Sequence, residues 1–355
     1  MREEITELWE RDWLYSLVIT PGLGRRRLRD MYNERGSFQE VAEHFFDITG
    51  QITREQVVLD KQARLRNGVE FVSFLDEEYP EMLGEIPDPP LLLFYRGDLA
   101  LLKQPCIGVV GSRKPTAYGR AACGFLVKQL VDAGFVIVSG LAYGIDGEAH
   151  RTALRQGGGT VAVLGCGIDQ VYPSSHRALY REISSSGLVL SEYPPGIPPV
   201  PGLFPERNRI VSGLSCGVLI VEAAEQSGSL ITADCALEQG REVFAVPGPI
   251  FSEVSAGPHN LIKQGAKLVT SSADIVAECT HLVLPAAPVA SDNRLDGIEP
   301  EEKRLFERLT YEAAHWDELY ASVGPADRPT LNRSLLRLEA KGLVCSLPGG
   351  YYSRK

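Results

Sequence analysis

Residues 107–119, IGVVGSRKPTAYG, carry the pattern that decides the fold of this chain. They begin with a short apolar run, IGVV, whose β-branched residues predict a buried strand. The run ends at the turn Gly111-Ser112-Arg113, and a helix is expected to start near Thr116. A strand, a glycine turn and a helix direct backbone N–H groups and a helix dipole at one point, where a phosphate could bind. Such a turn can also serve packing alone, so both interpretations stay open.

The same alternation of strand, turn and helix continues through the middle of the chain. Further apolar runs, each followed by a glycine or proline turn and a helical pattern, occupy residues 136–139, 161–164, 188–190, 218–221 and 243–246. Strands that alternate with helices predict right-handed crossovers and a parallel sheet. Ligands of such sheets bind at the carboxyl ends of the strands. Because most of these ends carry glycine, the pattern favours a long ligand that the backbone approaches closely.

Composition excludes several classes of protein. With 355 residues, of which 44% are hydrophobic, the chain is expected to form two or three globular domains. No apolar run approaches the ~18 residues of a membrane span, and the charged start lacks the apolar region of a signal peptide. The sequence therefore predicts a cytoplasmic protein without membrane contact. Its seven cysteines are scattered and form no CxxC pair, which predicts reduced core residues and neither a metal site nor a cofactor.

Charge is unevenly distributed along the chain. The formal net charge is −10, yet residues 106–216 carry 10 basic and 7 acidic side chains, whereas residues 1–104 carry 13 and 20. A cationic site on an acidic body is compatible with a polyanionic partner, because binding responds to the local field rather than to the net charge. The segment that opens with the glycine turn is therefore the expected place for such a partner.

The stretch FPERNR at residues 204–209 adds candidate phosphate ligands. It places Arg207, Asn208 and Arg209 at a predicted helix start, with the aromatic Phe204 beside them. A guanidinium group fits phosphate oxygens in a bidentate way that lysine does not. This stretch is therefore expected to contribute two cations and a stacking ring to the binding site.

Ser227-Gly228-Ser229 precedes another predicted helix, at residues 230–238. Hydroxyl groups and backbone amides would converge there as in an anion-binding nest. A serine that only caps the helix would need no ligand, and this alternative stays open.

The N-terminal part shows helical spacing of apolar residues, among them Trp9, Trp13 and Leu17. The hairpin TPGLG at residues 20–24, followed by RRRLR, resembles that of helix-hairpin-helix and SAM-like domains, whose glycine amides can contact a DNA phosphate. A tight turn beside a solvated basic face explains the same residues at least as well.

The C-terminal part follows a stretch of linker composition, LPAAPVASDN at residues 284–293. Three helical stretches then precede a hairpin with a Gly-Gly turn, which predicts a winged helix. On its third helix Arg333, Arg337 and Lys341 recur on one face. A solvated face explains this spacing about as well as DNA contact does.

The predicted fold class is α/β, with a Rossmann-like, doubly wound parallel sheet as the core. We expect a helical SAM-like domain at residues 1–85, the DNA-binding core at 86–280, a linker at 281–297 and a winged-helix domain at 298–355.

Several motifs together resemble the DNA-processing protein A family, called DprA or Smf. GSRKPTAYG, SGLAYGID, VAVLGCGIDQVYP, LSEYPPG, FPERNRIVSGLS and GPHNLIKQGAKLV occur in the order and spacing of that family, over nearly the whole chain. The resemblance implies a homodimeric recombination mediator without catalytic residues. It implies that the protein binds single-stranded DNA without sequence preference, cooperates with single-strand-binding protein and loads RecA onto incoming strands during natural transformation.

The resemblance also assigns roles to individual residues. Arg113 matches the arginine of the family's GSR loop, and residues 207–209 match its FPxRNR motif, so both belong to the expected cationic pocket, with Phe204 as a stacking neighbour. A lysine commonly follows Tyr-Pro in the family, whereas this chain has Ser174, and Arg177 could supply the missing cation.

Dimerisation in the family involves the end of the core, which corresponds to residues 257–268 here. The resemblance points to His259, Ile262 and Leu268 as interface residues.

Two other functions remain as alternatives. A nucleotide-binding or nucleotide-hydrolysing enzyme could use Glu222 as a base, but no second carboxylate, histidine or metal cluster is evidently paired with it, and His150 is expected to be a packed residue. The absence of GxGxxG followed by an acidic residue disfavours an NAD oxidoreductase. A winged-helix regulator would bind particular duplex sites instead of single strands.

Overall fold

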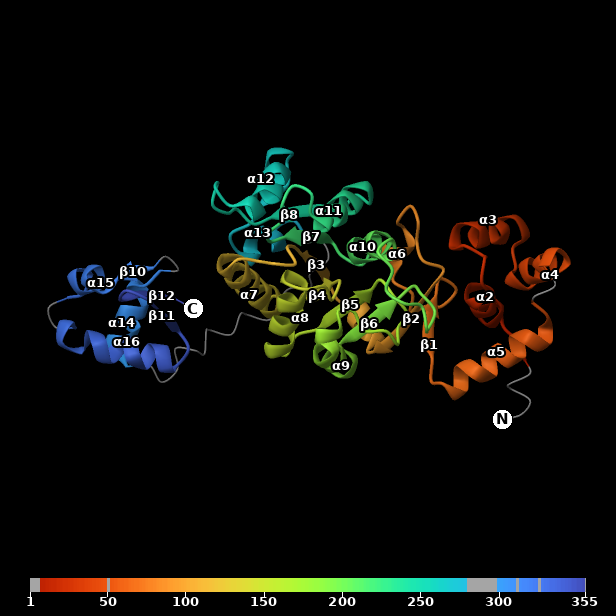
Figure 1. Ribbon diagram of the computed structural model, residues 1–355, viewed down its shortest axis with the longest axis horizontal. Helices are drawn as coiled ribbons and strands as arrows, with labels where there is room; N and C mark the ends of the chain where they lie inside the picture. Colours follow the sequence, from red (N-terminus) through yellow and green to blue (C-terminus); the bar gives the residue numbers. More distant parts are fainter. Residues whose placement is uncertain (1–6, 50–51, 280–298, 311–312, 325–326, 355) are drawn as a thin grey trace. The chain divides into compact units, whose positions relative to one another are not determined.

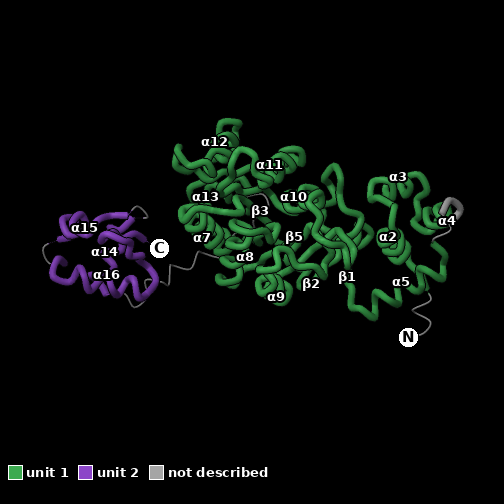
Figure 2. The backbone as a smooth tube through the Cα atoms, in the orientation of Figure 1, with its two compact units in different colours: residues 1–286 green, residues 287–355 purple. Residues whose placement is uncertain are grey.

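The computed structural model of the protein describes residues 7–49, 52–279, 299–310, 313–324 and 327–354 (Figure 1). The predicted linker at residues 281–297 lies outside the described residues. The chain divides into two compact units, Met1–Ala286 and Ala287–Lys355 (Figure 2).

The first unit is built on a sheet that has nine strands among the described residues, in the order β1-β2-β6-β5-β4-β3-β7-β8-β9. The seven strands from β3 to β9 all run parallel to one another. Strands β1 and β2 are antiparallel additions at the edge next to β6. The predicted α/β class and parallel core are confirmed. The strands are β1 Glu70–Ser73, β2 Leu92–Gly97, β3 Cys106–Val110, β4 Val136–Ser139, β5 Thr160–Leu164, β6 Leu188–Ser191, β7 Gly217–Ile220, β8 Glu242–Ala245 and β9 Lys267–Leu268.

The direction of the strand order reverses between β3 and β7. Strands β3 to β6 follow one another toward one edge of the sheet, and the chain then crosses back to place β7, β8 and β9 on the other side of β3. In doubly wound sheets a ligand binds in the crevice at this reversal. A ligand site is therefore expected at the carboxyl ends of β3 and β7.

Helices cover both faces of the sheet (Figure 1). In β3, Ile107 and Val109 pack with α7 and α8 on one face, whereas Val110 packs with α10 and α11 on the other. This two-sided burial explains the continuous apolar runs of the sequence. The core helices are α6 Glu81–Gly84, α7 Ala117–Asp132, α8 Ile145–Arg155, α9 Arg177–Ser186, α10 Leu203–Gly213, α11 Gly228–Glu238, α12 Ala256–Lys263 and α13 Ser272–Val276.

The N-terminal helices pack against the antiparallel edge of the sheet. They are α2 Glu10–Ile19, α3 Arg25–Arg35, α4 Phe38–Thr49 and α5 Arg54–Arg66. Tyr15 of α2 stacks on Phe71 of β1 with ring centroids 5.6 Å apart, in one apolar cluster with Phe94 of β2. Strand β1 lies in the stretch that we expected to be helical. Its four residues become a strand because pairing with β2 buries Phe71 and Val72.

The second unit has the predicted winged-helix arrangement. Its elements are α14 Pro300–Arg308, β10 Ala314–His315, α15 Trp316–Ser322, α16 Leu331–Ala340, β11 Val344–Leu347 and β12 Tyr351–Arg354, with the strands in the order β10-β12-β11. Strands β11 and β12 form the hairpin around the Gly-Gly turn.

The basic face of α16 is turned toward α14 within this unit. Arg333 pairs with Glu301 at 2.8 Å, and both Arg337 and Lys341 pair with Glu302, at 3.3 and 2.7 Å. Glu302 is only 1% exposed. The three cations thus have acidic partners within the unit, while their side chains stay between 37% and 58% exposed, so these ion pairs do not hide the basic stripe from solvent.

Two further expectations concern the whole chain. All seven cysteines are free, and only Cys235 and Cys345 are not fully buried. Across the described residues, no helix combines the length and the apolarity needed to cross a bilayer.

Candidate nucleic-acid interface

A cavity of about 660 Å³ opens at the carboxyl ends of β3 and β7. Its walls come from residues 110–114 after β3, 142–146 after β4, 201–208 at the start of α10 and 224–232 at the start of α11, together with Tyr172. Its charged wall residues are Arg113, Lys114 and Arg207 against a single carboxylate, Asp146. The cavity is therefore cationic although the chain as a whole is acidic.

The turn after β3 presents two cations to this cavity. The amide of Ser112 donates a hydrogen bond to the carbonyl of Glu222 at 2.6 Å, which fixes the turn to the end of β7. Arg113 and Lys114, the next two residues, are exposed, and neither has an ion-pair partner in the part of the chain that the structure describes. Their charges are therefore available to a ligand.

The N-terminus of α7 is closed by the chain's own carboxylate. The amide and hydroxyl of Thr116, the N-cap, both donate to Glu222, at 2.9 and 2.5 Å. Glu222 is 2% exposed. The expected phosphate site at this helix start is thus occupied internally, because a buried carboxylate already satisfies the helix dipole. Glu222 is also unsuited to the role of a catalytic base in the alternative enzyme, since both its oxygens are engaged.

The N-terminus of α11 faces the cavity instead. Ser227, Gly228 and Ser229 all line it. The Ser227 hydroxyl accepts a hydrogen bond from the Ser229 amide at 3.4 Å and lies 2.8 Å from the Ser229 hydroxyl. In contrast to the start of α7, this helix start offers hydroxyl groups and a helix dipole to an anion.

Arg207 lies in the cavity wall with its guanidinium group against Gly140. A Cβ atom at residue 140 would lie 1.7 Å from Nη1 of Arg207, so only glycine allows this position. Arg207 is 5% exposed, and its Nε has no hydrogen-bond partner among the described residues. The site thus holds a largely desolvated cation that an anionic ligand would stabilise.

Asp146 is the counter-charge to Arg207. It is 6% exposed and accepts hydrogen bonds from the amides of Gly140 and Ala142, at 3.1 and 3.3 Å. Burial raises the pKa of Asp146, and the charge of Arg207 opposes this rise. Burial likewise lowers the pKa of Arg207 while Asp146 raises it. One carboxylate therefore balances only part of the positive charge in the cavity.

Asn208 and two aromatic rings complete the wall. The Asn208 amide donates to the carbonyl of Gly228 at 3.3 Å, which joins α10 to the start of α11. Phe204 packs over Gly165, and its ring centroid lies 5.3 Å from that of Tyr172. Tyr172 is 42% exposed, whereas Phe204 is half-buried. The pair offers an aromatic surface at the cavity.

Two of the expected ligands lie elsewhere. Arg209 points away from the cavity because it is about 200° around the helix from Arg207, and its Nη2 binds Glu192 at 2.6 Å. It is 9% exposed and does not line the cavity. Arg177 is exposed at the first turn of α9 and does not line it either. Neither arginine belongs to the proposed set of DNA contacts.

Sequence reasoning missed several wall residues. Lys114, Asp146 and Tyr172 all line the cavity, although the sequence pattern did not indicate them as ligands. Lys114 could have been found from its position next to Arg113. Asp146 and Tyr172 lie in motifs of the family. Whether their side chains face the cavity depends on where the strand ends meet in three dimensions.

The three expected dimer residues lie near the far edge of the sheet. His259 is half-buried and its Nε2 contacts the carbonyl of Gly248 at 3.0 Å. Ile262 is half-buried against the core, whereas Leu268 of the edge strand β9 is 45% exposed. Of the three, Leu268 offers an apolar side chain to a partner.

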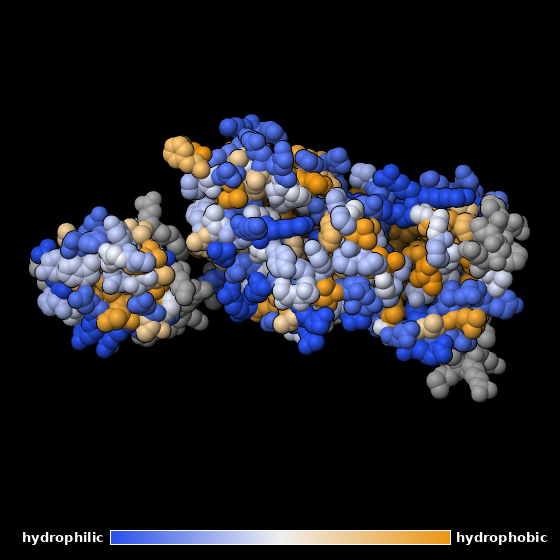
Figure 3. Space-filling view, in the orientation of Figure 1, coloured by the Kyte–Doolittle hydropathy of each residue, from blue (hydrophilic) through white to orange (hydrophobic). Residues whose placement is uncertain are grey.

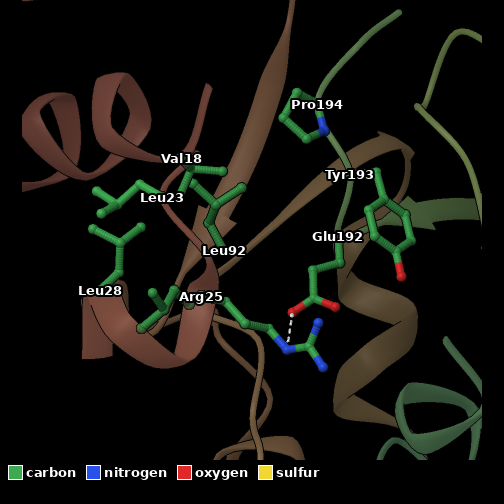
Figure 4. Close-up of a pocket in the computed structure, with 9 residues that line it drawn as sticks. Val18, Leu23, Arg25, Leu28, Leu92, Glu192, Tyr193 and Pro194 are labelled. Carbon is green, nitrogen blue, oxygen red and sulfur yellow. Dashed lines mark ion pairs between the residues drawn. The ribbon is translucent and has the colours of Figure 1, made fainter. Parts of the chain in front are cut away.

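A smaller cavity, of about 150 Å³, lies where the N-terminal helices meet the sheet (Figure 4). Apolar side chains of α2, α3 and β2 line it, together with Arg25 and Glu192, whose Nε and Oε1 are 3.8 Å apart. The space-filling view shows apolar side chains at a hollow in this part of the unit (Figure 3).

Arg25 joins the predicted hairpin region to α10. Its Nη2 lies 3.0 Å from Asp88 and its Nη1 lies 2.7 Å from Glu206. The side chain is 25% exposed. These ion pairs favour a structural role for Arg25 over a contact with DNA phosphate.

Family models match both units of the chain. Residues 70–280 match the model of DNA recombination-mediator protein A, and residues 285–350 match the DprA winged helix domain.

Similar proteins and structures carry the same family names. The chain is 51% identical to DNA processing protein DprA of Streptococcus pneumoniae over 206 residues, which cover 58% of this chain and 73% of that protein. It is 43% identical to protein Smf of Escherichia coli over 289 residues, 78% of this chain and 75% of that one.

Two solved structures resemble the fold. The structure of DprA from Streptococcus pneumoniae has a TM-score of 0.65 and 42% identity, over 76% of this chain and 96% of that one. A structure that describes the single-stranded DNA binding mode of DNA processing protein A from Helicobacter pylori has a TM-score of 0.54 and 31% identity, over 60% and 96%. The chain therefore belongs to the DprA/Smf family of DNA recombination-mediator proteins, as its motifs predicted.

Proposed function

We propose that this protein binds single-stranded DNA, without sequence preference, in the cavity at the carboxyl ends of β3 and β7. The observation that carries the proposal is the cavity itself, where Arg113, Lys114 and Arg207 face one carboxylate beside the open N-terminus of α11. Cations and helix amides bind the phosphates that every sequence shares. The Helicobacter pylori relative, whose structure describes binding of single-stranded DNA, supports the choice of ligand.

The wall residues divide into two proposed roles. Arg113, Arg207 and Asn208, with Gly111, Ser112 and the Ser227-Gly228-Ser229 turn, would hold phosphate oxygens. Phe204 and Tyr172 would stack with a base, an interaction that tolerates any sequence. Base-edge readout is not required by this arrangement.

We further propose that the protein acts as a recombination mediator in the cytoplasm. Bound to single strands as a homodimer, it would cooperate with single-strand-binding protein and load RecA during natural transformation. Membership of a family of recombination mediators supports this role. Two cavities in one dimer would bind one strand with a gain in effective concentration.

No catalytic step is part of the proposal. The carboxylate that an enzyme of this fold might use, Glu222, is buried and engaged by Thr116. The family is named for mediation of recombination and not for an enzyme activity.

A competition assay tests this proposal. Labelled oligo-dT is titrated with the protein and displaced by unlabelled oligo-dT, by duplex of the same length or by a mononucleotide. We expect displacement by oligo-dT at the lowest concentration, and no release of base from nucleoside monophosphates. Preferential displacement by a duplex, or turnover of the monophosphates, would contradict the proposal.

A further inference from the structure

Two buried thiols from distant parts of the chain meet at one end of the sheet. Cys216 precedes β7, and Cys279 follows α13, 63 positions later. Their Sγ atoms lie 2.7 Å apart, about 0.7 Å longer than a covalent S–S bond. Cys216 is 7% exposed and Cys279 is 1% exposed.

The other buried thiols have different neighbours. The Sγ atoms of Cys106, Cys123 and Cys166 each contact a backbone carbonyl, at 3.4, 3.8 and 3.6 Å. Within the described residues, Cys216 and Cys279 are the thiols that contact each other. Their juxtaposition therefore distinguishes them from cysteines that only fill the core.

We propose that Cys216 and Cys279 form a redox-active dithiol, which a peroxide converts to a disulfide joining α13 to the start of β7. The reactant is hydrogen peroxide or a small hydroperoxide, and a low-molecular-weight thiol reverses the reaction. This inference does not depend on the proposed DNA-binding function.

The two thiols differ in acidity in a way that fits the reaction. The hydrogen bond with Cys216 lowers the pKa of Cys279, whereas burial opposes this shift. The same hydrogen bond, together with burial, raises the pKa of Cys216. We assign the nucleophilic thiolate to Cys279 on this basis, and the Sγ–Sγ contact of 2.7 Å places Cys216 next to it.

The reaction then balances in two steps. The Cys279 thiolate attacks one peroxide oxygen, so an S–O bond forms, the O–O bond breaks and the leaving hydroxide takes up a proton to become water. The sulfur of Cys216 next attacks the sulfenic sulfur, so the S–S bond forms and the S–O bond breaks. The departing hydroxide takes the Cys216 proton and leaves as a second water. Two thiols lose two electrons, and the peroxide gains them.

The burial of the two thiols limits the rate of oxidation, and the disulfide changes the stability of the protein. Because Cys279 is 1% exposed, peroxide must enter through local opening near the short helix α13. Once formed, the bond closes a loop across β7, β8 and β9 and restricts the unfolded chain. The oxidised protein should therefore be more stable than the reduced one.

Peptide mapping of the full-length protein tests the inference. The reduced, folded protein is treated with hydrogen peroxide, quenched, alkylated in denaturant and digested without reductant. We expect a peptide pair linked through Cys216 and Cys279, and a melting temperature raised by roughly 5–10 °C that dithiothreitol restores. Recovery of both residues as alkylated thiols after this treatment, or linkage to other cysteines, would overturn the proposal.

Single-residue variants distinguish a specific Cys216–Cys279 disulfide from unspecific oxidation of cysteines. Cys279→Ser should abolish both the linked peptide and the rise in melting temperature. In Cys216→Ser, a dimedone adduct at Cys279 should appear, because the sulfenic acid no longer has its partner. Cys123→Ser, which removes another buried thiol of the same core, should leave the linked peptide unchanged. If folded Cys123→Ser protein gave no linked peptide, the assignment would be contradicted. If a variant fails to fold, the peptide map of the wild-type protein alone still tests the proposal.

Discussion

Arg207 reaches the cavity wall because residue 140 has no side chain. In Gly140→Ala, the new methyl group would lie 1.7 Å from Nη1 of Arg207 and must displace the guanidinium, which is the movable end of a long side chain. We expect affinity for oligo-dT to fall roughly tenfold, about the loss of one charge-assisted contact, with the fold retained. Fluorescence anisotropy measures the affinity, and circular dichroism checks the fold.

Gly202→Ala is the matched control for this substitution. Gly202 is the N-cap of α10, the helix that carries Arg207, and a Cβ atom there meets nothing within 4 Å. We expect its affinity to equal that of the wild type. Equal affinities for the wild type and Gly140→Ala would show that the position of Arg207 does not matter for binding.

His150 makes stability depend on pH. Its Nδ1 lies 2.7 Å from the Thr160 hydroxyl, which itself donates to the carbonyl of Ile137, so Nδ1 carries the proton and the buried Nε2 has no partner within the described residues. Burial lowers the pKa of His150 to about 3. The unfolded histidine has a pKa of about 6.5, so below that pH the unfolded state binds a proton that the folded state does not.

Stability should therefore fall as the pH falls from about 6.5 toward 3. His150 contributes a slope of up to about 1.4 kcal/mol per pH unit in this window. In His150→Gln the dependence of unfolding free energy on pH between 4.5 and 6 should be shallower by that amount. Urea unfolding at a series of pH values measures the two slopes, and parallel curves would show that His150 is protonated in the folded state.

At the scale of elements, Arg25 holds the start of α3 against α10 and the segment before β2. In Arg25→Ala, contacts to Asp88 and Glu206 at 3.0 and 2.7 Å are lost. We expect a loss of about 1 kcal/mol in stability, because the side chain is three-quarters buried but still partly solvated. Hydrogen exchange of the α3 amides should become faster.

The neighbouring residue provides the comparison. Arg26 lies on the same helix, but its side chain is 80% exposed and its Nε is 3.5 Å from Asp88. Arg26→Ala should change neither stability nor exchange measurably. If the two variants behaved alike, the ion pairs of Arg25 would not be what holds α3 in place.

The core elements could be predicted from sequence because local signals agree there. Strands β3 to β8 are each a short apolar run followed by a turn, as at residues 107–111. Strand β1 follows the clear break Asn67-Gly68, which ends α5, so its start could have been found from the sequence. Strand β9 has only two residues and carries little local pattern, so its pairing with β8, a long-range effect, decides it.

The candidate site could be predicted only in part, for a similar reason. Thr116 and Glu222 are 106 positions apart, and no local pattern shows that this carboxylate closes the helix start. Arg207 and Arg209 look equivalent in sequence, but helical geometry sends Arg209 to Glu192 and Arg207 to the cavity. Motifs identify the segments that meet, whereas the direction of each side chain follows from packing.

At the scale of the whole molecule, the proposed homodimer depends on the far edge of the sheet. Leu268 is 45% exposed on β9. In Leu268→Arg a buried interface would acquire an unpaired charge, so the dimer should dissociate into folded monomers at least tenfold more readily. Sedimentation velocity over a concentration series measures this, and an unchanged dimer would place the interface elsewhere.

In the proposed function, the cavity at the carboxyl ends of β3 and β7 binds the phosphates of an unpaired strand. A salt titration of oligo-dT affinity tests it most directly, with wild type, Arg113→Ala and the control Arg177→Ala, whose arginine is exposed outside the cavity. Arg113→Ala should bind more weakly and with a slope of log affinity against log salt reduced by about 0.7, the loss of one phosphate contact. Arg177→Ala should follow the wild type. Superimposable curves for wild type and Arg113→Ala would contradict the claim.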